Sequence, residues 1–120
     1  MINAVHAVMY TKDAEAIRAF FRDVLELPSA DAGGGWLIFA LPPAELGIHP
    51  HDGDPHHQLY LMCDDISVTV QQLQSKGVEF IEPVRDVRFG LLTALRLPDG
   101  ETLSLYQPKH ASPLPGISPA

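Results

Sequence analysis

Apolar residues recur at helical spacing in the first quarter of the chain. They fall at positions i, i+3, i+4, i+7 and i+8, namely Ile17, Phe20, Phe21, Val24 and Leu25. Asp13 precedes this stripe and has the side chain preferred at a helix N-cap, while Pro28 cannot continue a helix. The pattern predicts one amphipathic helix between these two residues, with its apolar face turned toward a core.

Shorter apolar or alternating runs flank this helix. Residues 2–10 are rich in residues typical of strands, 36–41 form an aromatic and branched run, and 45–49 alternate. Three consecutive glycines at 33–35 predict a turn before the second run. We therefore expect three strands around the first helix, followed by a loop at 50–57.

The second half repeats this order. Residues 58–63 predict a strand, and Asp64 and Asp65 then cap a helix that carries Ile66, Val70 and Leu73 on one face. Gly77 predicts the end of this helix. Further strands are predicted at 78–81, 91–97 and 102–107, with a turn at 98–100 between the last two.

The chain thus has the order β-α-β-β-β twice, which indicates an α+β fold. Residues 6–13 match residues 58–65 at an offset of 52 positions, from strand start to helix cap. One face of each half's sheet receives its helix. The other face must cover a second half, a second chain or a ligand. Residues 109–120 follow as a Pro-rich tail without periodicity, either mobile or laid over a partner chain.

Composition and net charge reduce the number of functional classes that fit this chain. A chain of 120 residues provides one domain, and its net charge of −7 disfavours binding to nucleic acid or to an anionic membrane surface. Cys63 is the single cysteine, so an intrachain disulfide and a multi-cysteine zinc site are excluded. We find no apolar stretch of about 20 residues and no basic leader, and we therefore expect a cytoplasmic protein.

Several segments together carry a resemblance to a known family. They are 5–8 (VHAV), Asp13 and 20–25 (FFRDVL) in the first half, and 60–66 (YLMCDDI), Leu73, 76–78 (KGV) and 97–101 (LPDGE) in the second. In this order they resemble the vicinal oxygen chelate superfamily, which includes glyoxalase I, bleomycin- and fosfomycin-resistance proteins and extradiol dioxygenases. The resemblance implies two βαβββ modules with curled mixed sheets that form a cleft. Module one would span about 1–50 and module two about 57–108, within one domain at 1–108.

The resemblance also implies where a metal would bind, on the first and last strands of each module. His6 occupies the first such position and fits it. Gln58 stands at the corresponding position of module two, where an amide oxygen is a poor ligand for Zn, Ni or Fe(II). Ser104 stands where the family has glutamate. Two of the family's metal positions are therefore replaced.

The remaining position lies on the last strand of module one. Alternation turns Glu45 and His49 toward the cleft, so either could be the ligand. With His6, and with His56 from the strand entry, the set could hold a divalent metal such as Zn, Ni, Fe or Mn. Glu45 is then a possible catalytic base. The other reading of the histidines between 49 and 57 is a solvated loop that binds nickel adventitiously.

Candidate ligand-binding residues follow from strand alternation and local context. They are Trp36, Gln58, Tyr60, Arg96, Ser104 and Tyr106. Alternation places the polar-tipped residues of two strands on the same cleft face, where they could line a pocket or simply be half-buried. Trp36, beside three glycines, could stack on an aromatic ligand, and Arg96 is either an anion anchor or a surface group.

Glu26 departs from the family at the end of the first helix. The family usually has glycine there, and a left-handed non-glycine residue costs roughly 1 kcal/mol. A reshaped helix exit, and with it a different ligand shape, is therefore expected.

Three hypotheses follow. The first is a small-molecule-binding homodimer with a degenerate metal site, which binds its ligand without chemistry. The second is a metal-dependent lyase, isomerase or dioxygenase, in which the metal would act as a Lewis acid. The third is an interaction module, suggested by the Pro-rich tail. Tightly held stoichiometric metal would favour the second, and a lack of any ligand that raises the melting temperature would favour the third.

Overall fold

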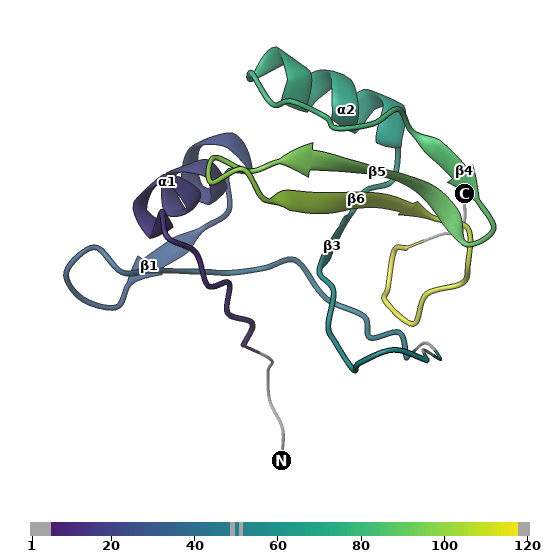
Figure 1. Ribbon diagram of the computed structural model, residues 1–120, viewed down its shortest axis with the longest axis horizontal. Helices are drawn as coiled ribbons and strands as arrows, with labels where there is room; N and C mark the ends of the chain where they lie inside the picture. Colours follow the sequence, from purple (N-terminus) through teal and green to yellow (C-terminus); the bar gives the residue numbers. More distant parts are fainter. Residues whose placement is uncertain (1–5, 49, 51, 118–120) are drawn as a thin grey trace.

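The structure is a computed structural model that describes residues 6–48, 50 and 52–117. Two helical segments and two sheets make up these residues (Figure 1). The first half contributes a helix and a two-stranded ribbon, and the second half contributes a helix and a four-stranded sheet. The α+β class is therefore confirmed.

The first helix begins where the sequence predicts. Helix α1 (Ala14–Ala19) continues into η1 (Phe20–Val24), a π-helical turn. The Asp13 carboxylate accepts a hydrogen bond from the Ala16 amide at 3.3 Å, which satisfies one free N–H of the first turn. The predicted stripe is confirmed, because its first three members (Ile17, Phe20 and Phe21) are buried and the last two pack against them.

Glu26 keeps the left-handed conformation at the helix exit, with φ at 57°. The chain therefore keeps a left-handed residue at this exit without a glycine, and a helix exit reshaped relative to the family stays a prediction. The Glu26 side chain forms an ion pair with Lys76 at 3.3 Å, and the Lys76 ammonium also donates to the Val24 carbonyl at 3.1 Å. These contacts fix the exit against the second half of the chain and help to offset the cost of a left-handed non-glycine residue.

The ribbon of the first half consists of β1 (Ser29–Asp31) and β2 (Leu37–Phe39), paired antiparallel. The turn between them contains the three glycines, all with positive φ. The Asp31 carboxylate accepts hydrogen bonds from the Gly33 amide at 2.7 Å and the Gly35 amide at 3.2 Å. The predicted turn and strand are confirmed here, whereas β1, which is exposed throughout, was not predicted.

The second half forms one mixed sheet in the order β3-β6-β5-β4. Its strands are β3 (Tyr60–Met62), β4 (Arg85–Val87), β5 (Gly90–Arg96) and β6 (Thr102–Pro108). Strand β3 runs parallel to β6, and the other neighbours are antiparallel. The predicted strands at 58–63, 91–97 and 102–107 are confirmed within a few residues of their ends. The predicted turn at 98–100 joins β5 to β6.

Helix α2 (Ile66–Ser75) covers one face of this sheet (Figure 1). Asp65 caps it by accepting from the Val68 amide at 3.2 Å, and Gly77 ends it with a φ of 87°. The Gln107 side chain of β6 accepts from the Ile66 amide at 2.9 Å, which ties the helix start to the sheet. Both predicted ends of this helix are confirmed.

The core lies between the two helices and the face of the sheet that they cover. Its buried members are Ile17, Phe20, Phe21, Leu73, Val78, Leu95, Leu97 and Leu103. Leu95, at the centre of β5, is fully buried. The odd-numbered residues of β5 and β6 therefore face the helices, and the even-numbered residues face the other way.

Three predicted strands are absent from the described residues. Residues 6–10 and 45–48 have no strand pairing, and residues 78–81 make only an isolated bridge from Phe80 to Leu95. A strand exists only when another strand completes its hydrogen bonds, and within the described chain no strand pairs with the first two segments. Residues 1–5 and 49 lie outside the described residues.

The tail folds back on its own sheet as far as residue 117. Lys109 forms an ion pair with Asp86 of β4, and its amide donates to the Phe89 carbonyl at 2.9 Å. The first residues of the tail are thus held against the chain's own sheet.

Candidate ligand-binding face

The even-numbered residues of β3, β5 and β6 lie on the face of the four-stranded sheet that is turned away from α2. Arg85 and Val87 of β4 share this face, because they pair with Leu92 and Gly90 of β5. The register pairs Tyr60 of β3 with Ser104 of β6, and it pairs Tyr106 with Met62 on one side and Leu92 on the other. Paired residues project to the same side of a sheet, so Tyr60, Ser104 and Tyr106 share this face. All three are half-buried. We call this surface the tyrosine face.

Aromatic rings cluster on the tyrosine face around Tyr106. Its ring centroid lies 5.8 Å from that of Tyr60 and 5.9 Å from that of Phe89, with both pairs tilted at 59°. The Tyr60 hydroxyl donates to the Gln58 side-chain oxygen at 2.7 Å. The structure therefore brings together the predicted residues Gln58, Tyr60 and Tyr106, and it adds Phe89, which sequence reasoning did not single out.

His110 of the tail also contacts Tyr106. Its Nδ1 lies 2.8 Å from the Ala111 carbonyl, which can only accept, so Nδ1 carries the proton. Nε2 of His110 and the Tyr106 hydroxyl are hydrogen-bonded to each other. His110 was missed because it lies in a Pro-rich segment without periodicity, where no local pattern assigns a side chain to a face.

Glu45 lies near the same hydroxyl. The connection after β2 runs along the side of the sheet opposite to α2 (Figure 1). Burial raises the pKa of the Tyr106 phenol, and the negative charges of Glu45 and of an ionised Tyr60 raise it further. Within the described residues, Oε1 of Glu45 is buried and has no hydrogen-bond partner. The predicted metal ligand or base is therefore a neighbour of phenol groups, with one unsatisfied oxygen.

Trp36 and Arg96 lie in other environments. Trp36 is exposed in the turn between β1 and β2, where the Arg18 guanidinium stacks over its ring at 5.2 Å. Arg96, at the end of β5, lies 3.7 Å from a Glu79 oxygen and donates to the Gly100 carbonyl at 2.9 Å. The guanidinium groups of Arg18 and Arg96 are thus each in contact with other groups of this chain. Trp36 belongs to the ribbon of the first half.

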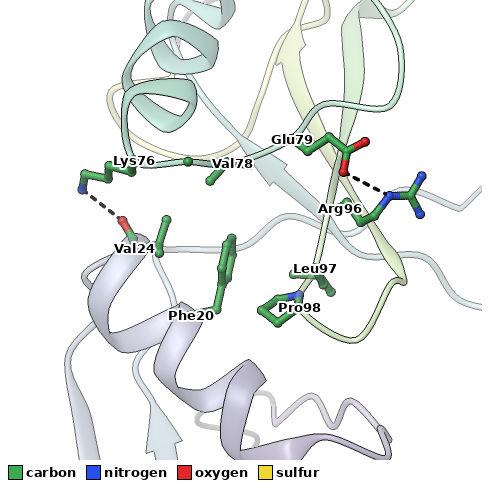
Figure 2. Close-up of a pocket in the computed structure, with 9 residues that line it drawn as sticks. Phe20, Val24, Lys76, Val78, Glu79, Arg96, Leu97 and Pro98 are labelled. Atoms are coloured by element: carbon green, nitrogen blue, oxygen red, sulfur yellow. Dashed lines mark hydrogen bonds and ion pairs between the residues drawn. The ribbon is translucent and has the colours of Figure 1, made fainter.

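Arg96 borders an open groove of about 280 Å³ on the helix side of the molecule. Figure 2 shows this groove between η1, the end of α2 and the turn after β5, with Phe20, Leu97 and Pro98 on its walls. Its two cations, Lys76 and Arg96, are both paired. The described groove is therefore separate from the tyrosine face, and the expected cleft between two curled sheets stays a prediction.

The predicted metal ligands that the structure describes, His6, Glu45 and His56, do not form a cluster. His6 is exposed on an unpaired segment, and His56 Nδ1 donates to the Asp54 carbonyl at 3.1 Å. His49 lies outside the described residues. In the part of the chain that the structure describes, no three His, Cys, Asp or Glu side chains are placed to hold a metal ion.

The oxygen groups on the tyrosine face are also poorly suited to bind a transition metal. The negative charge of Glu45 acts on the Tyr106 phenol, and the Gln58 amide oxygen on this face already accepts a hydrogen bond from the Tyr60 hydroxyl. Transition metals prefer imidazole, thiolate or several carboxylates. The described residues therefore do not fit a divalent metal centre.

Among residues 6–48, 50 and 52–117, no helix combines the length and apolar character needed to span a bilayer.

Comparisons with known proteins place this geometry in a family. The sequence model of the Glyoxalase/Bleomycin resistance protein/Dioxygenase superfamily matches residues 3–105. The search of curated proteins finds no match. Among solved structures, the antibiotic-binding protein TnmS3 from Streptomyces sp. CB03234 is 23% identical with a TM-score of 0.62, covering 90% of this chain and 99% of its own. A lactoylglutathione lyase from Agrobacterium tumefaciens is 17% identical with a TM-score of 0.63, covering 88% and 94%.

A superfamily member from Sphaerobacter thermophilus is also similar, with 20% identity, a TM-score of 0.60 and coverage of 88% and 98%. At these identities the solved structures establish the fold and leave the activity open. The match over residues 3–105 includes both halves of the chain and confirms the resemblance read from the sequence. The chain belongs to the Glyoxalase/Bleomycin resistance protein/Dioxygenase superfamily.

Proposed function

We propose that this protein binds a small organic molecule on the tyrosine face, without a metal centre and without chemistry. The observation that carries the proposal is the pair of rings of Tyr60 and Tyr106, 5.8 Å apart on a half-buried face that the helices leave uncovered. Aromatic side chains accompanied by a few polar groups are typical of the lining of small-molecule sites. Gln58 and Ser104 supply polar groups beside the rings.

The similarity to TnmS3 supports a binding role. That protein is described as an antibiotic-binding protein, and its fold matches this chain over nearly its whole length. Because the superfamily fold serves several chemistries, the support comes from the fold together with the aromatic face, and the ligand's identity does not follow from it.

We propose further that the protein is a homodimer in the cytoplasm. Tyr10, Leu46 and Ile48 are 94%, 84% and 90% exposed, on the two segments predicted as strands but left unpaired. Apolar side chains concentrated on unpaired extended segments indicate a surface that another chain covers. A second copy of the chain would supply strand partners for these segments and enclose the bound ligand.

A thermal-shift screen of small organic compounds tests the binding role. A ligand at about 100 times its Kd stabilises the folded state by about 2.7 kcal/mol, which a melting curve detects. The stabilisation should be lost in Tyr106→Ala and kept in Lys76→Ala, which alters the separate groove of Figure 2. Stabilisation that persists in the first variant, or is lost only in the second, overturns the proposal. If no compound stabilises the protein, an interaction module is favoured instead.

A metal-dependent lyase, isomerase or dioxygenase is the second candidate. It rests on His6, which stands at the position where metal-dependent members have their first ligand, and on the fold shared with a lactoylglutathione lyase. Elemental analysis of untagged, dialysed protein separates the two. We expect far less than one equivalent of any transition metal. A near-stoichiometric metal that His6→Ala removes would favour the enzyme.

A further inference from the structure

The unsatisfied oxygen of Glu45 is the feature of the tyrosine face that the chain itself does not explain. A buried carboxylate oxygen without a donor is costly, and nearly all such groups in folded proteins have a partner. Glu45 takes part in none of the ion pairs among the described residues. Arg85 of β4, which the register places on this face, pairs instead with Glu82, and Lys109 pairs with Asp86.

The surroundings of Glu45 favour a positive partner. The faces of Tyr60, Tyr106 and Phe89 carry negative electrostatic potential, which attracts an organic cation. Phe89 is 48% exposed, so its ring is available to a bound molecule. The chain's net charge of −7 adds a long-range attraction for cations and repels anions.

We infer that the molecule bound on the tyrosine face is an arylalkylamine, that is, an aromatic ring system that carries a basic aliphatic amine. Its protonated nitrogen donates to Oε1 of Glu45 while its flat ring system packs on Tyr60 and Tyr106. The inference rests on the proposed function and adds the class of ligand to it. A charge-assisted hydrogen bond to a carboxylate shielded from water is stronger than one between neutral groups.

The segment that carries Glu45 allows a ligand to reach it. Among the described residues, the backbone of 41–48 makes no hydrogen bond. Moving this segment aside therefore breaks no backbone pairing, and a ligand can take the place of the groups that cover Oε1.

The test compares three probes that share an indole ring and differ in charge. Tryptamine carries a protonated amine, tryptophol a neutral hydroxyl, and indole-3-acetate a carboxylate. Their Kd values are measured by calorimetry at pH 7 with the full chain. We expect tryptamine to bind most tightly and indole-3-acetate most weakly, with the tryptamine preference falling as salt is added.

Two matched variants locate the charge that is responsible. Glu45→Gln keeps the shape of the side chain and should weaken tryptamine at least about tenfold, while it changes tryptophol less than about twofold. Glu79→Gln removes an equally charged side chain at the separate groove and should leave all three probes unchanged. Tyr106→Ala, with Tyr60→Ala as a second variant, should weaken tryptamine and tryptophol alike.

The failures of the two proposals can be told apart. Equal binding of tryptamine and tryptophol, both lost in Tyr106→Ala and Tyr60→Ala, would overturn the amine and keep the binding face. A preference for tryptamine that is unchanged in Glu45→Gln would also overturn the amine and keep the binding face. Absence of tryptamine binding overturns the amine, while the thermal-shift screen decides the binding face independently. Tryptamine binding that depends on neither tyrosine would overturn both.

Discussion

Gly90 and the ring of Tyr106 are in direct contact across strands β5 and β6. A Cβ atom added at Gly90 would lie 2.6 Å from Cε2 of Tyr106 and 2.5 Å from the Gln107 carbonyl oxygen. Real Cβ atoms do not approach other atoms so closely. The absence of a side chain at Gly90 is thus what allows the Tyr106 ring to lie against β5, in the position where it meets Tyr60 and Phe89.

Gly90→Ala should therefore displace the Tyr106 ring and destabilise the fold. Overpacking of this kind costs about 1–3 kcal/mol, which chemical denaturation measures. Ligand binding on the tyrosine face should weaken as well. Gly47→Ala is the control, because a Cβ at Gly47 meets nothing within 4 Å and its φ is not positive. Equal stabilities of the two variants would contradict this account of the contact.

Asp65→Ala should lower the stability of the protein by about 1 kcal/mol, because the Val68 amide loses its acceptor at the start of α2. Urea denaturation of the variant measures the change. Asp64→Ala is a matched control one residue away, since Asp64 accepts no hydrogen bond from the helix among the described residues. A larger loss in the control would show that the cap is assigned to the wrong aspartate.

Cys63 should react slowly with iodoacetamide in the folded protein. Burial raises the pKa of its thiol above the ordinary value, and the negative charges of Asp64 and Asp65 raise it further against a hydrogen bond with Thr69 that lowers it. Because the thiolate is the reacting form, the rate profile of the native protein should lie at higher pH than that of the urea-unfolded chain. A native profile at lower pH would contradict this.

Leu46→Lys combined with Ile48→Lys should shift the protein from dimer to monomer in sedimentation velocity experiments. Two charges on the exposed apolar segment would oppose its burial against a second copy. Val68→Lys, on the exposed side of α2, is a control that adds a charge away from these segments. A wild-type protein that remains monomeric at micromolar concentration would contradict the dimer.

The sequence predicts best what depends on neighbouring residues. Both helices and their caps at Asp13 and Asp65 are decided by spacing and by side chains within one turn, and both are confirmed. The strands at 6–10 and 45–48 were wrong for the described residues, because alternation shows only that a segment suits a sheet. Whether a partner strand lies beside it depends on distant parts of the chain or on another chain.

In the candidate site, too, the sequence predicts the features that depend on local pattern and misses those that depend on distant parts of the chain. Strand alternation placed Tyr60, Ser104 and Tyr106 on one face, since their strands pair in a regular register. It could not show that Arg18 covers Trp36 or that His110 returns from the tail to Tyr106. Glu45 was identified as a chemical group, but its neighbours, which decide whether it suits a metal or an amine, lie on strands far away in sequence.

The most direct test of the central claim is to map a bound ligand by amide chemical shifts. The first compound that raises the melting temperature is titrated into isotope-labelled protein. We predict that the largest shifts occur at Tyr60, Ser104 and Tyr106 and at the neighbouring residues of β3 and β6. Shifts centred instead on Lys76 and Arg96, at the groove of Figure 2, would contradict the account.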